Sequence, residues 1–447
     1  MTDSIFKAYD IRGVYPTQLN EDICRYIGNA FVAFTGADRV LVGWDMRVSS
    51  PDLAAAFIEG ALLAGADVVE LGLVSTDECW FASGRHQAPA AMFTASHNPA
   101  EYGGIKLCRA GAAPIGEETG LRQIQAQVND KVLVRAEDIG TASRLDVLDT
   151  FSEHVKSFVN LGSLKPLIVV ADVANGMGGL IVPKVFEGLP FALTMMYPEL
   201  DGTFPNHPAD PIQPENLKDL QAKVLELGAD VGLAFDGDAD RVFLVDDKAQ
   251  PVSGSTTTAL VARAMLEGHE GANVVYNLIC SKSVPAVIVE SGGVPIKTRV
   301  GHSFIKQVMA ETDAVFGGEH SGHYYFRDNF RADSGLIAAM VILSVLSTSG
   351  KRLSELRTEV ERFAASGEIN MRVDNAGAVL ESLKGKFQPA QVDELDGLTV
   401  DCGDWWFNLR PSNTEPLLRL NLEAADPVAV AARVAEVREM ISQVTSA

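Results

Sequence analysis

The sequence has few cysteines, and no two of them form a C-x-x-C pair. The five are odd in number and far apart: Cys24, Cys79, Cys108, Cys280 and Cys402. This spacing excludes a disulfide framework and a structural zinc site, and it is typical of reduced, packed thiols. The first residues, Met1-Thr2-Asp3-Ser4, contain an acid and precede no apolar segment of the signal-peptide kind. We therefore expect a cytoplasmic protein.

Basic residues are scarce relative to acidic ones. The chain has 37 Lys and Arg against 59 Asp and Glu, and its formal net charge is -22. Nucleic acids and anionic membranes require broad basic surfaces, so neither is expected as a partner. A small anionic ligand would need a local cluster of Arg and Lys that acts against the overall charge.

Long hydrophobic runs are also absent. The longest stretch without a charged residue runs from 334 to 350 and contains several serines. It is shorter than the roughly 20 apolar residues of a membrane-spanning helix, so it predicts a buried core helix. There is no low-complexity tract, which excludes a disordered protein. At 447 residues and 47% hydrophobic content, the chain is long enough for three or four domains.

The first third of the chain alternates between strand and helix patterns. Residues 39–43, 67–74 and 89–93 predict buried strands. Ser49, Ser50 and Pro51 predict the capped start of a helix that ends at Gly65. This β-α-β order favours an α/β layer domain.

The same plan returns twice and then changes. Charged and polar segments between 128 and 165 indicate a domain boundary. The two units that follow have predicted strands at 167–172, 231–235, 241–245, 273–279 and 314–316. Their predicted helices are at 257–266 and 303–310. The last unit has strands at 371–373, 398–401, 405–409 and 417–422. It ends in a helix whose apolar face comprises Val428, Val430, Val434, Val437 and Ile441. We predict three related mixed-sheet α/β domains, 1–147, 148–252 and 253–366, and a smaller α+β domain, 367–447.

One serine lies where a strand meets a loop. Thr94-Ala95-Ser96-His97-Asn98-Pro99 follows a predicted strand, and Gly103-Gly104-Ile105-Lys106 comes shortly after it. Such a position, between a strand and a loop broken by Pro and Gly, presents a side chain to a cleft. Taken alone, the segment fits a structural Ser-His-Asn turn equally well.

A second segment, Asp236-Gly237-Asp238-Ala239-Asp240-Arg241, carries three alternate carboxylates between two predicted strands. Alternate residues of an extended turn project to one side, which suits a hard divalent cation with oxygen ligands. An EF-hand is excluded, because that loop needs Gly at 241, Glu at 247 and flanking helices. A solvated acidic hairpin is the alternative, although three such acids would repel one another without a cation.

Two further loops carry groups that bind sugars and anions. Gly317-Gly318-Glu319-His320-Ser321-Gly322-His323 combines glycines, which let a ligand approach the backbone, with hydrogen-bonding side chains. A carboxylate there accepts hydrogen bonds from vicinal sugar hydroxyls. Arg410-Pro411-Ser412-Asn413-Thr414 offers a guanidinium, hydroxyls, an amide and backbone N–H groups to an anion. Each loop, taken alone, also fits a structural turn.

Several well-known site patterns are missing. The glycine loop at 175–179 is not G-x-G-x-x-G, which disfavours a dinucleotide site. Walker A, G-x-S-x-G and H-E-x-x-H patterns are absent, which disfavours P-loop kinases, α/β-hydrolases and zincins. Asp45 and Arg47 are interpreted only as a structural ion pair.

Together these segments resemble the α-D-phosphohexomutase family, and within it the phosphomannomutase/phosphoglucomutase group. The resemblance covers the whole chain in order and rests on five motifs: Phe6 to Gly13, Thr94 to Pro99, Asp236 to Arg241, Gly318 to His323 and Arg410 to Thr414. Residues 201–207 and 300–306 are similar to family segments as well. The resemblance implies four domains, three related and one smaller, with the active site in the central cleft.

The resemblance also implies roles for individual side chains. Ser96 would be the phosphoserine, supported by His97, and Mg²⁺ would bind it together with Asp236, Asp238 and Asp240. The reaction centre would comprise Arg12, Lys106, Arg241 and His323. Sugar contacts would come from Tyr9, Arg12, His302, Glu319, Ser321 and His323, and contacts to the non-reacting phosphate from Arg410, Ser412, Asn413 and Thr414. For proton transfer at the substrate oxygen we favour Lys106 with Arg241.

The implied activity is that of an isomerase acting on small sugar phosphates. Phospho-Ser96 would phosphorylate the substrate to give a hexose 1,6-bisphosphate, which is both the intermediate and an activator. This bisphosphate would turn end for end and return its other phosphate to Ser96. We expect interconversion of mannose 6-phosphate and mannose 1-phosphate. The alternatives are a phosphoglucomutase or dual-specificity enzyme, then a phosphoglucosamine mutase, a phosphatase, or a non-catalytic sugar-phosphate-binding protein. His320 and Ala239 depart from the common family pattern, and no sequence feature defines an oligomeric state.

Overall fold

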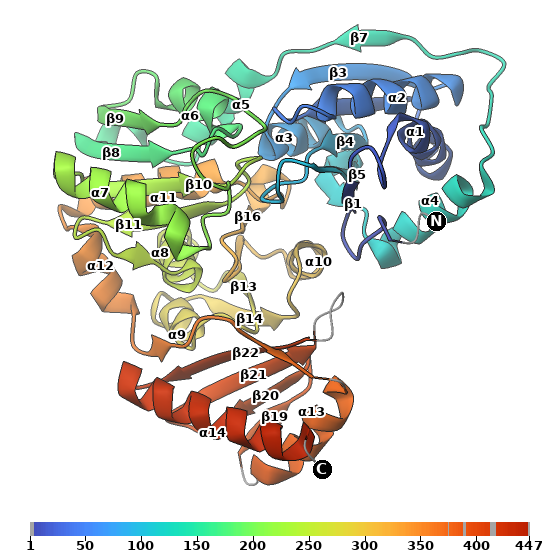
Figure 1. Ribbon diagram of the computed structural model, residues 1–447. Coiled ribbons are helices and arrows are strands. Elements are labelled where there is room, and N and C mark those ends of the chain that lie inside the picture. The colour runs from blue at the N-terminus through green and yellow to red at the C-terminus, as the bar shows by residue number, and fades with distance from the viewer. Residues whose placement is uncertain (1–3, 374, 388–389, 412–416, 446–447) are drawn as a thin grey trace.

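The computed structural model describes residues 4–373, 375–387, 390–411 and 417–445. These residues form four sheets with helices packed against them. In Figure 1 the first two units lie side by side at the top, the third lies beneath them, and the fourth is at the bottom. The predicted fold class, three mixed α/β units and a smaller C-terminal one, is confirmed.

The first unit has a seven-stranded sheet in the order β1-β5-β4-β2-β3-β7, with β6 beside β5. Strands β4, β2, β3 and β7 are parallel, whereas β5 runs antiparallel to both β4 and β1. Its strands are β1 (Ile11–Val14), β2 (Arg39–Trp44), β3 (Asp67–Leu73), β4 (Ala90–Phe93), β5 (Tyr102–Arg109), β6 (Ala113–Pro114) and β7 (Ala142–Arg144). Its helices are α1 (Glu21–Thr35), α2 (Ser50–Leu63), α3 (Thr76–His86) and α4 (Leu121–Asp130).

The second unit has five strands in the order β12-β11-β10-β8-β9. Here β10, β8 and β9 are parallel, and β11 pairs antiparallel with β10. The strands are β8 (Leu167–Asp172), β9 (Phe191–Met196), β10 (Val231–Phe235), β11 (Val242–Asp246) and β12 (Pro251–Val252). The helices are α5 (Leu148–Lys156), α6 (Gly178–Phe186) and α7 (Lys218–Leu227).

The third unit has four strands in the order β14-β13-β15-β16, of which only β16 is antiparallel to its neighbour. The strands are β13 (Asn273–Asn277), β14 (Val294–Thr298), β15 (Phe316–Gly318) and β16 (Tyr324–Phe326). The helices are α8 (Gly254–Leu266), α9 (Ser283–Glu290), α10 (His302–Thr312), α11 (Gly335–Ser349) and α12 (Leu353–Val360).

The fourth unit is an antiparallel sheet in the order β17-β22-β21-β20-β19, with β18 also beside β22. Its elements are β17 (Ala364–Ala365), β18 (Ile369–Arg372), α13 (Ala376–Lys384), β19 (Gln391–Asp393), β20 (Leu398–Asp401), β21 (Trp406–Pro411), β22 (Leu417–Ala424) and α14 (Pro427–Thr445). Because β17 pairs with β22, this sheet begins three residues before the range predicted for the last domain.

The three α/β units share one local plan. In each, a parallel strand is followed by a loop and then by an antiparallel partner: β4 and β5, β10 and β11, β15 and β16. The loops between them are residues 94–101, 236–241 and 319–323, which are the three segments singled out in these units by their chemistry. Each candidate loop therefore lies at the corresponding end of an equivalent strand pair in its own unit.

The hydrophobic cores do not follow the unit boundaries. One continuous cluster of buried side chains extends through the second and third units, and it also includes Phe81 of α3. Helix α11, which the absence of charge predicts to be buried, belongs to this cluster on all sides. The first and fourth units have cores of their own. In the described residues no single helix is long and apolar enough to cross a membrane; only α11 and α12 jointly meet that criterion, with a bend of 103° between them.

Two local predictions are wrong. Ser49 precedes α2 but its side chain does not cap the helix, and the Ser50 hydroxyl instead donates a hydrogen bond to Asp45 at 2.6 Å. Val428 is 80% exposed and does not belong to the apolar face predicted for α14, because a residue two positions from Val430 points to the opposite side of the helix, whereas Val430, Val437 and Ile441 are buried.

Because Val437 is buried and Val428 is exposed, the same substitution should affect stability differently at these two positions of α14. Val437→Ser removes buried methyl groups and buries a hydroxyl, which costs about 3 kcal/mol, while Val428→Ser on the exposed turn leaves stability within about 0.5 kcal/mol. Hydrogen exchange of the β20–β22 amides reports on this unit alone. Equal protection of those amides in the two variants would contradict the assignment of the packed face.

Candidate active site

Ser96 is held in a left-handed backbone conformation, with φ of 51°. Its N–H donates to the Thr94 hydroxyl at 2.9 Å, and its own hydroxyl donates to Oδ2 of Asp236 at 2.8 Å. The side chain is 3% exposed. A non-glycine residue in this region of φ/ψ space is strained, and such positions cluster at functional sites. The loop thus aims the Ser96 oxygen at the carboxylates of the second unit.

Arg47 fixes the shape of this loop. Its guanidinium donates to the backbone oxygens of Ser96 at 2.8 Å, Asn98 at 2.6 Å, Pro99 at 2.8 Å and Tyr102 at 3.1 Å. The ion pair with Asp45 is also present, at 3.3 Å. The sequence interpretation of this pair as merely structural therefore missed what Arg47 does, because its acceptors are backbone oxygens that leave no mark in the sequence.

The three carboxylates of residues 236–240 lie together and are fully buried. Ligand-type oxygens of Asp236, Asp238 and Asp240 all lie within 4.8 Å of one another. The pKa values of Asp236 and Asp240 are both raised to about 6, chiefly by burial. The neighbouring Asp238 contributes to the rise at Asp240. Burial acts in the same direction on Asp238, but Lys106 and its hydrogen bond lower the pKa of this carboxyl below its usual range.

Two buried cations offset this negative charge. Nζ of Lys106 donates to Asp238 at 2.8 Å and to Asp240 at 2.5 Å, and Arg241 forms an ion pair with Asp236 at 2.8 Å. Burial would lower the pKa of Lys106, but Asp238 and Asp240 raise it above its usual value, so the side chain remains an ammonium. Lys106 comes from β5 of the first unit and therefore joins the first two units at the site.

The residues present suit a divalent cation. Two carboxylate oxygens that are buried and accept no hydrogen bond, Oδ1 of Asp238 and Oδ1 of Asp240, belong to the same cluster. Hard divalent cations prefer carboxylate oxygens of this kind. The Thr76 hydroxyl, which no sequence pattern singles out, donates to Oδ2 of Asp238 at 2.6 Å and so orients that carboxylate.

His97 does not form a serine–histidine base pair. Arg241 donates to its Nδ1 at 2.7 Å, whereas the Ser96 hydroxyl is 3.3 Å from the same atom and donates to Asp236. Arg241, burial and Arg12 hold the pKa of His97 well below its usual range. Arg12 donates to Ala95 O at 3.2 Å and to the Asn98 side chain. Both side chains thus support the Ser96 loop.

The third unit contributes a buried acid. Glu319 accepts hydrogen bonds from Asn277 at 3.1 Å, from the Gly301 N–H at 3.2 Å and from the Tyr325 hydroxyl at 2.8 Å. Burial raises its pKa, and these three donors act against that rise. Ser321 lies 2.9 Å from Nδ1 of His323, which forms an isolated strand bridge to Arg241.

Tyr9 and His302 close the site from opposite units. Their rings meet edge to face at 5.1 Å, and the Tyr9 hydroxyl donates to Val300 O at 3.1 Å. Burial lowers the pKa of His302 to about 3, and burial likewise lowers the pKa of His323 to about 4. Both imidazoles are therefore neutral at physiological pH.

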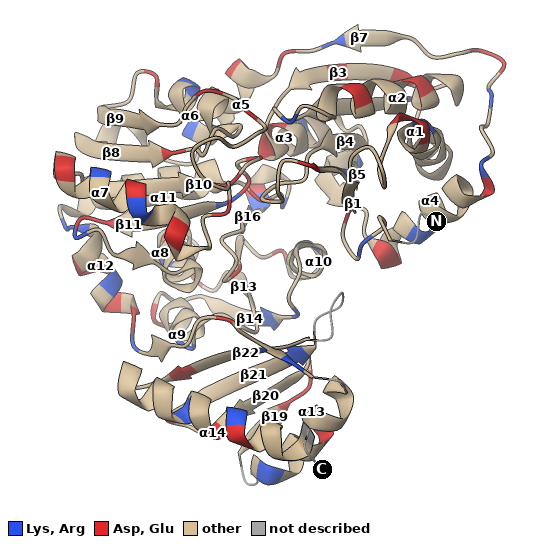
Figure 2. Ribbon diagram, in the orientation of Figure 1, with Lys and Arg blue, Asp and Glu red and all other residues tan. Residues whose placement is uncertain are grey.

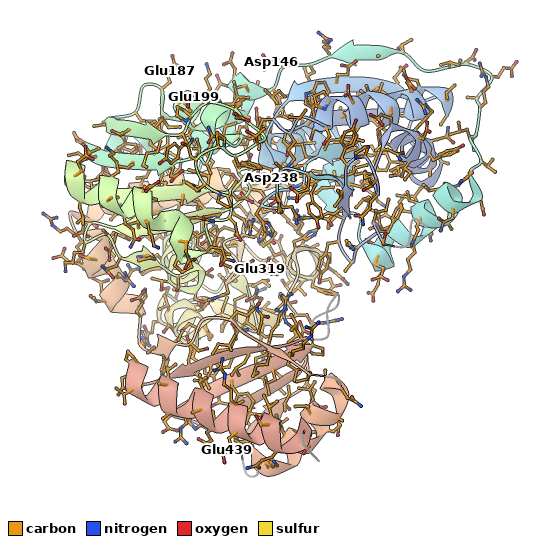
Figure 3. The ribbon with its side chains drawn as sticks, viewed as in Figure 1. Asp146, Glu187, Glu199, Asp238, Glu319 and Glu439 are labelled. Carbon is orange, nitrogen blue, oxygen red and sulfur yellow. The ribbon has the colours of Figure 1, made fainter. Side chains whose placement is uncertain are left out.

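Most of the predicted side chains surround one pocket of about 220 Å³. The predicted residues in its lining are Tyr9, Arg12, Ser96, His97, Lys106, Asp240, Arg241, His302, Glu319, Ser321 and His323. Asp236 and Asp238 lie behind this surface. Figure 3 labels Asp238 and Glu319 near the middle of the molecule, where the units meet.

Arg410 is not in the lining of that pocket. It lies on β21, 3.6 Å from Glu368 and 3.9 Å from Asp396. It nevertheless acts on Tyr9: burial, Glu319 and Asp396 raise the pKa of that hydroxyl, and Arg410 opposes them. Ser412, Asn413 and Thr414 lie outside the described residues.

The sequence also missed a buried ion pair that faces the pocket. Lys306 and Asp333 lie 2.7 Å apart, and both belong to the lining. The only available signal was the position of Lys306, one turn into α10, which indicates its direction but no partner.

The chain matches models of all four domains of one family. These are the phosphoglucomutase/phosphomannomutase alpha/beta/alpha domains I (residues 3–134), II (149–250) and III (253–363), and the C-terminal domain (368–440). The chain belongs to the phosphoglucomutase/phosphomannomutase family. It is a phosphohexomutase, and hence an isomerase.

Individual relatives are similar over their full length. A Xanthomonas campestris protein named phosphohexose mutases is 39% identical over 446 residues, covering 99% of this chain and 100% of the relative. A phosphomannomutase of Salmonella montevideo is 38% identical over 449 residues and 98% of each chain. The crystal structure of a family member from Burkholderia thailandensis has a TM-score of 0.89 and 32% identity, and covers 99% of this chain and 97% of the other.

The backbone contacts of Arg47 predict a specific defect. Arg47→Lys keeps the charge but loses the fork of donors that reaches four carbonyl oxygens, so we expect turnover to fall by about tenfold or more. Amide exchange of residues 94–102 should become faster at the same time. Arg25→Lys, at an exposed ion pair with Asp22 and Glu59, is the matched control. Wild-type exchange in Arg47→Lys would show that the loop is held by other contacts.

Proposed function

We propose that the protein is a phosphomannomutase that interconverts mannose 6-phosphate and mannose 1-phosphate through phospho-Ser96. The observation that carries this proposal is the Ser96 hydroxyl, 2.8 Å from Asp236 and in the same pocket as Glu319 and Ser321. A serine hydrolase would need a free base beside the nucleophile, whereas the Nδ1 lone pair of His97 is engaged by Arg241. Relatives named phosphomannomutase, at 38% identity and full length, support mannose as the sugar.

A phosphate on Ser96 requires more positive charge than the described side chains supply. It adds about -1.5 to -2 charges next to three carboxylates, whose ion pairs with lysine and arginine among the described residues are those of Lys106 and Arg241. We infer that Mg²⁺ binds to Asp236, Asp238, Asp240 and the phosphate. When bound, the ion neutralises charge on the transferring phosphoryl group.

Lys106 and Arg241 are suited to the reaction centre. Lys106 stays protonated and faces the pocket, so it can donate its proton to the substrate oxygen that leaves when a phosphate passes from the sugar to Ser96. In the opposite transfer, from phospho-Ser96 to the sugar, the attacking hydroxyl gives that proton back to Lys106. Arg241 reaches within 3.3 Å of the Ser96 oxygen and stabilises negative charge on the group in transfer. Arg12 holds the loop backbone, and His97 accepts from Arg241, so neither needs to exchange a proton.

Most of the contacts to the sugar come from the third unit, and Tyr9 adds one from the first. Glu319 already accepts three hydrogen bonds, which leaves its carboxylate room for about one more from a sugar hydroxyl. The other polar contacts to the sugar come from Ser321, His323, His302 and Tyr9. Since Glu319 lies apart from the phosphate sites, it can serve the hexose in either orientation.

The non-reacting phosphate is assigned to Arg410 with Ser412, Asn413 and Thr414. Arg410 faces only two distant carboxylates among the described residues, at 3.6 and 3.9 Å, so its donors are available to a ligand. With β17 in the fourth sheet, we place the last domain boundary at 363/364 and keep 147/148 and 252/253 for the others.

One assay with two substrates tests the activity. The protein should convert mannose 1-phosphate with trace bisphosphate and Mg²⁺, lose activity in EDTA, and regain it on Mg²⁺ addition. Intact mass should show one phosphate that is absent in Ser96→Ala. Comparable kcat/KM for glucose 1-phosphate would make the mannose assignment too narrow, and release of inorganic phosphate faster than isomer formation would indicate a phosphatase.

The proton-transfer role is tested at Lys106. Lys106→Ala should lower kcat by about 100-fold or more, the lower end of general acid–base contributions. Lys156→Ala, at a partly exposed lysine on α5 outside the pocket lining, serves as the control. Thermal unfolding of both variants separates a catalytic loss from a folding defect. A kcat for Lys106→Ala within a few fold of wild type would rule out this role.

A further inference from the structure

A larger cavity of about 850 Å³ adjoins the catalytic pocket. The two spaces share four lining residues: Tyr9, Ala112, Pro114 and Lys306. The cavity lies between the first and third units, with α4 on one side and the segment around α10 on the other. Both sides carry basic residues, which Figure 2 shows in blue on α4 and near the end of β14. We refer to this cavity as the basic vestibule.

The charge of its lining is opposite to that of the protein. Its cationic residues are Lys7, Arg109, Arg122, Arg299, Lys306 and Arg331, and the carboxylates in the lining are those of Glu117 and Glu118. The whole chain has a net charge of -22. A cluster of one sign in a concave surface raises the local concentration of ligands of the opposite sign.

Several of these cations lack a carboxylate partner. Arg122 pairs with Glu117 at 2.5 Å, and Lys306 with Asp333 at 2.7 Å. Among the described residues, no ion pair is formed by Lys7, Arg109 or Arg299. The Arg299 guanidinium lies over the Phe304 ring at 4.3 Å, which orients it and leaves its N–H donors free. These cations can therefore serve a ligand without breaking an ion pair.

Lys306 lies at the junction of the two spaces. It is 6% exposed and packs between the rings of Trp80 and Tyr325, at 5.6 and 5.7 Å. Because it belongs to both linings, an anionic group that leaves the catalytic pocket meets a cation before it reaches the vestibule. Lys306 is the cation common to the two linings, and its ion pair with Asp333 holds it at their junction.

The size of the catalytic pocket makes a second space useful. A hexose that carries two phosphates must release its contacts and exchange its two ends, and 220 Å³ is a quarter of the space next to it. Each phosphate monoester carries about -1.5 to -2 charges at pH 7, so the intermediate would be lost to solvent without compensating cations. The vestibule supplies both the volume and the charge.

We propose that the basic vestibule binds the hexose 1,6-bisphosphate between the two phosphoryl transfers, with Lys7 and Arg299 as phosphate ligands. The proposal rests on the proposed function, since it concerns the intermediate of that reaction. No covalent step takes place in the vestibule. Its role is to retain the intermediate while it turns.

Direct binding tests this without turnover. Ser96→Ala protein, titrated calorimetrically with glucose 1,6-bisphosphate, should show a second, weaker binding event. The second event should be lost when Lys7→Gln and Arg299→Gln are added to Ser96→Ala. The control adds Arg135→Gln and Lys218→Gln to Ser96→Ala instead, at two exposed cations outside the lining, and should retain the second event. A single event in all three proteins, or loss of the second event in the control, would overturn the proposal.

Release of the intermediate provides the second readout. In the double variant Lys7→Gln/Arg299→Gln, the amount of labelled bisphosphate released per turnover should rise by about tenfold. The kcat at saturating bisphosphate and the KM for mannose 1-phosphate should both stay within twofold of wild type. Unchanged release, or a fall in kcat at saturating bisphosphate, would contradict retention in the vestibule. Absence of any mutase activity in the wild type would refute the proposed function, while the titration would still report on the site.

Discussion

Three buried carboxylates must lie side by side at the centre of this molecule, and the arrangement around them follows from the need to compensate their charge. Asp236, Asp238 and Asp240 come from one loop, but Lys106 comes from β5 of another unit. A buried acid without a partner is costly, so the first and second units are drawn together at this point. The catalytic pocket is the surface that this cluster shares with the third unit.

The same junction is secured by neutral hydrogen bonds. At the start of α3, the Thr76 N–H and hydroxyl both bind Asp238, and the next residue, Asp77, accepts a hydrogen bond from Ser334 at the start of α11. One helix N-terminus in the first unit therefore reaches both the loop at 236–241 and the third unit. Together with the contacts of Arg47, these bonds hold the candidate loops in one geometry, which phosphoryl transfer requires.

Much of this organisation could be predicted from the sequence because local patterns encode it. Strands, the buried helix α11 and the carboxylate loop all follow from periodicity or from the chemistry of adjacent residues. What could not be predicted depends on distance in the fold. The acceptors of Arg47 are backbone oxygens, and the partner of Thr76 is 162 residues away. Such contacts have no local signature.

The core shared by the second and third units has a consequence for cooperativity. Helix α11 buries its whole circumference against side chains of both units, so neither can lose its packing without exposing apolar surface of the other. These two units therefore form a single unfolding unit, while the fourth unit has a core of its own. The loop at 236–241 and Glu319 are therefore both anchored on one cooperative body.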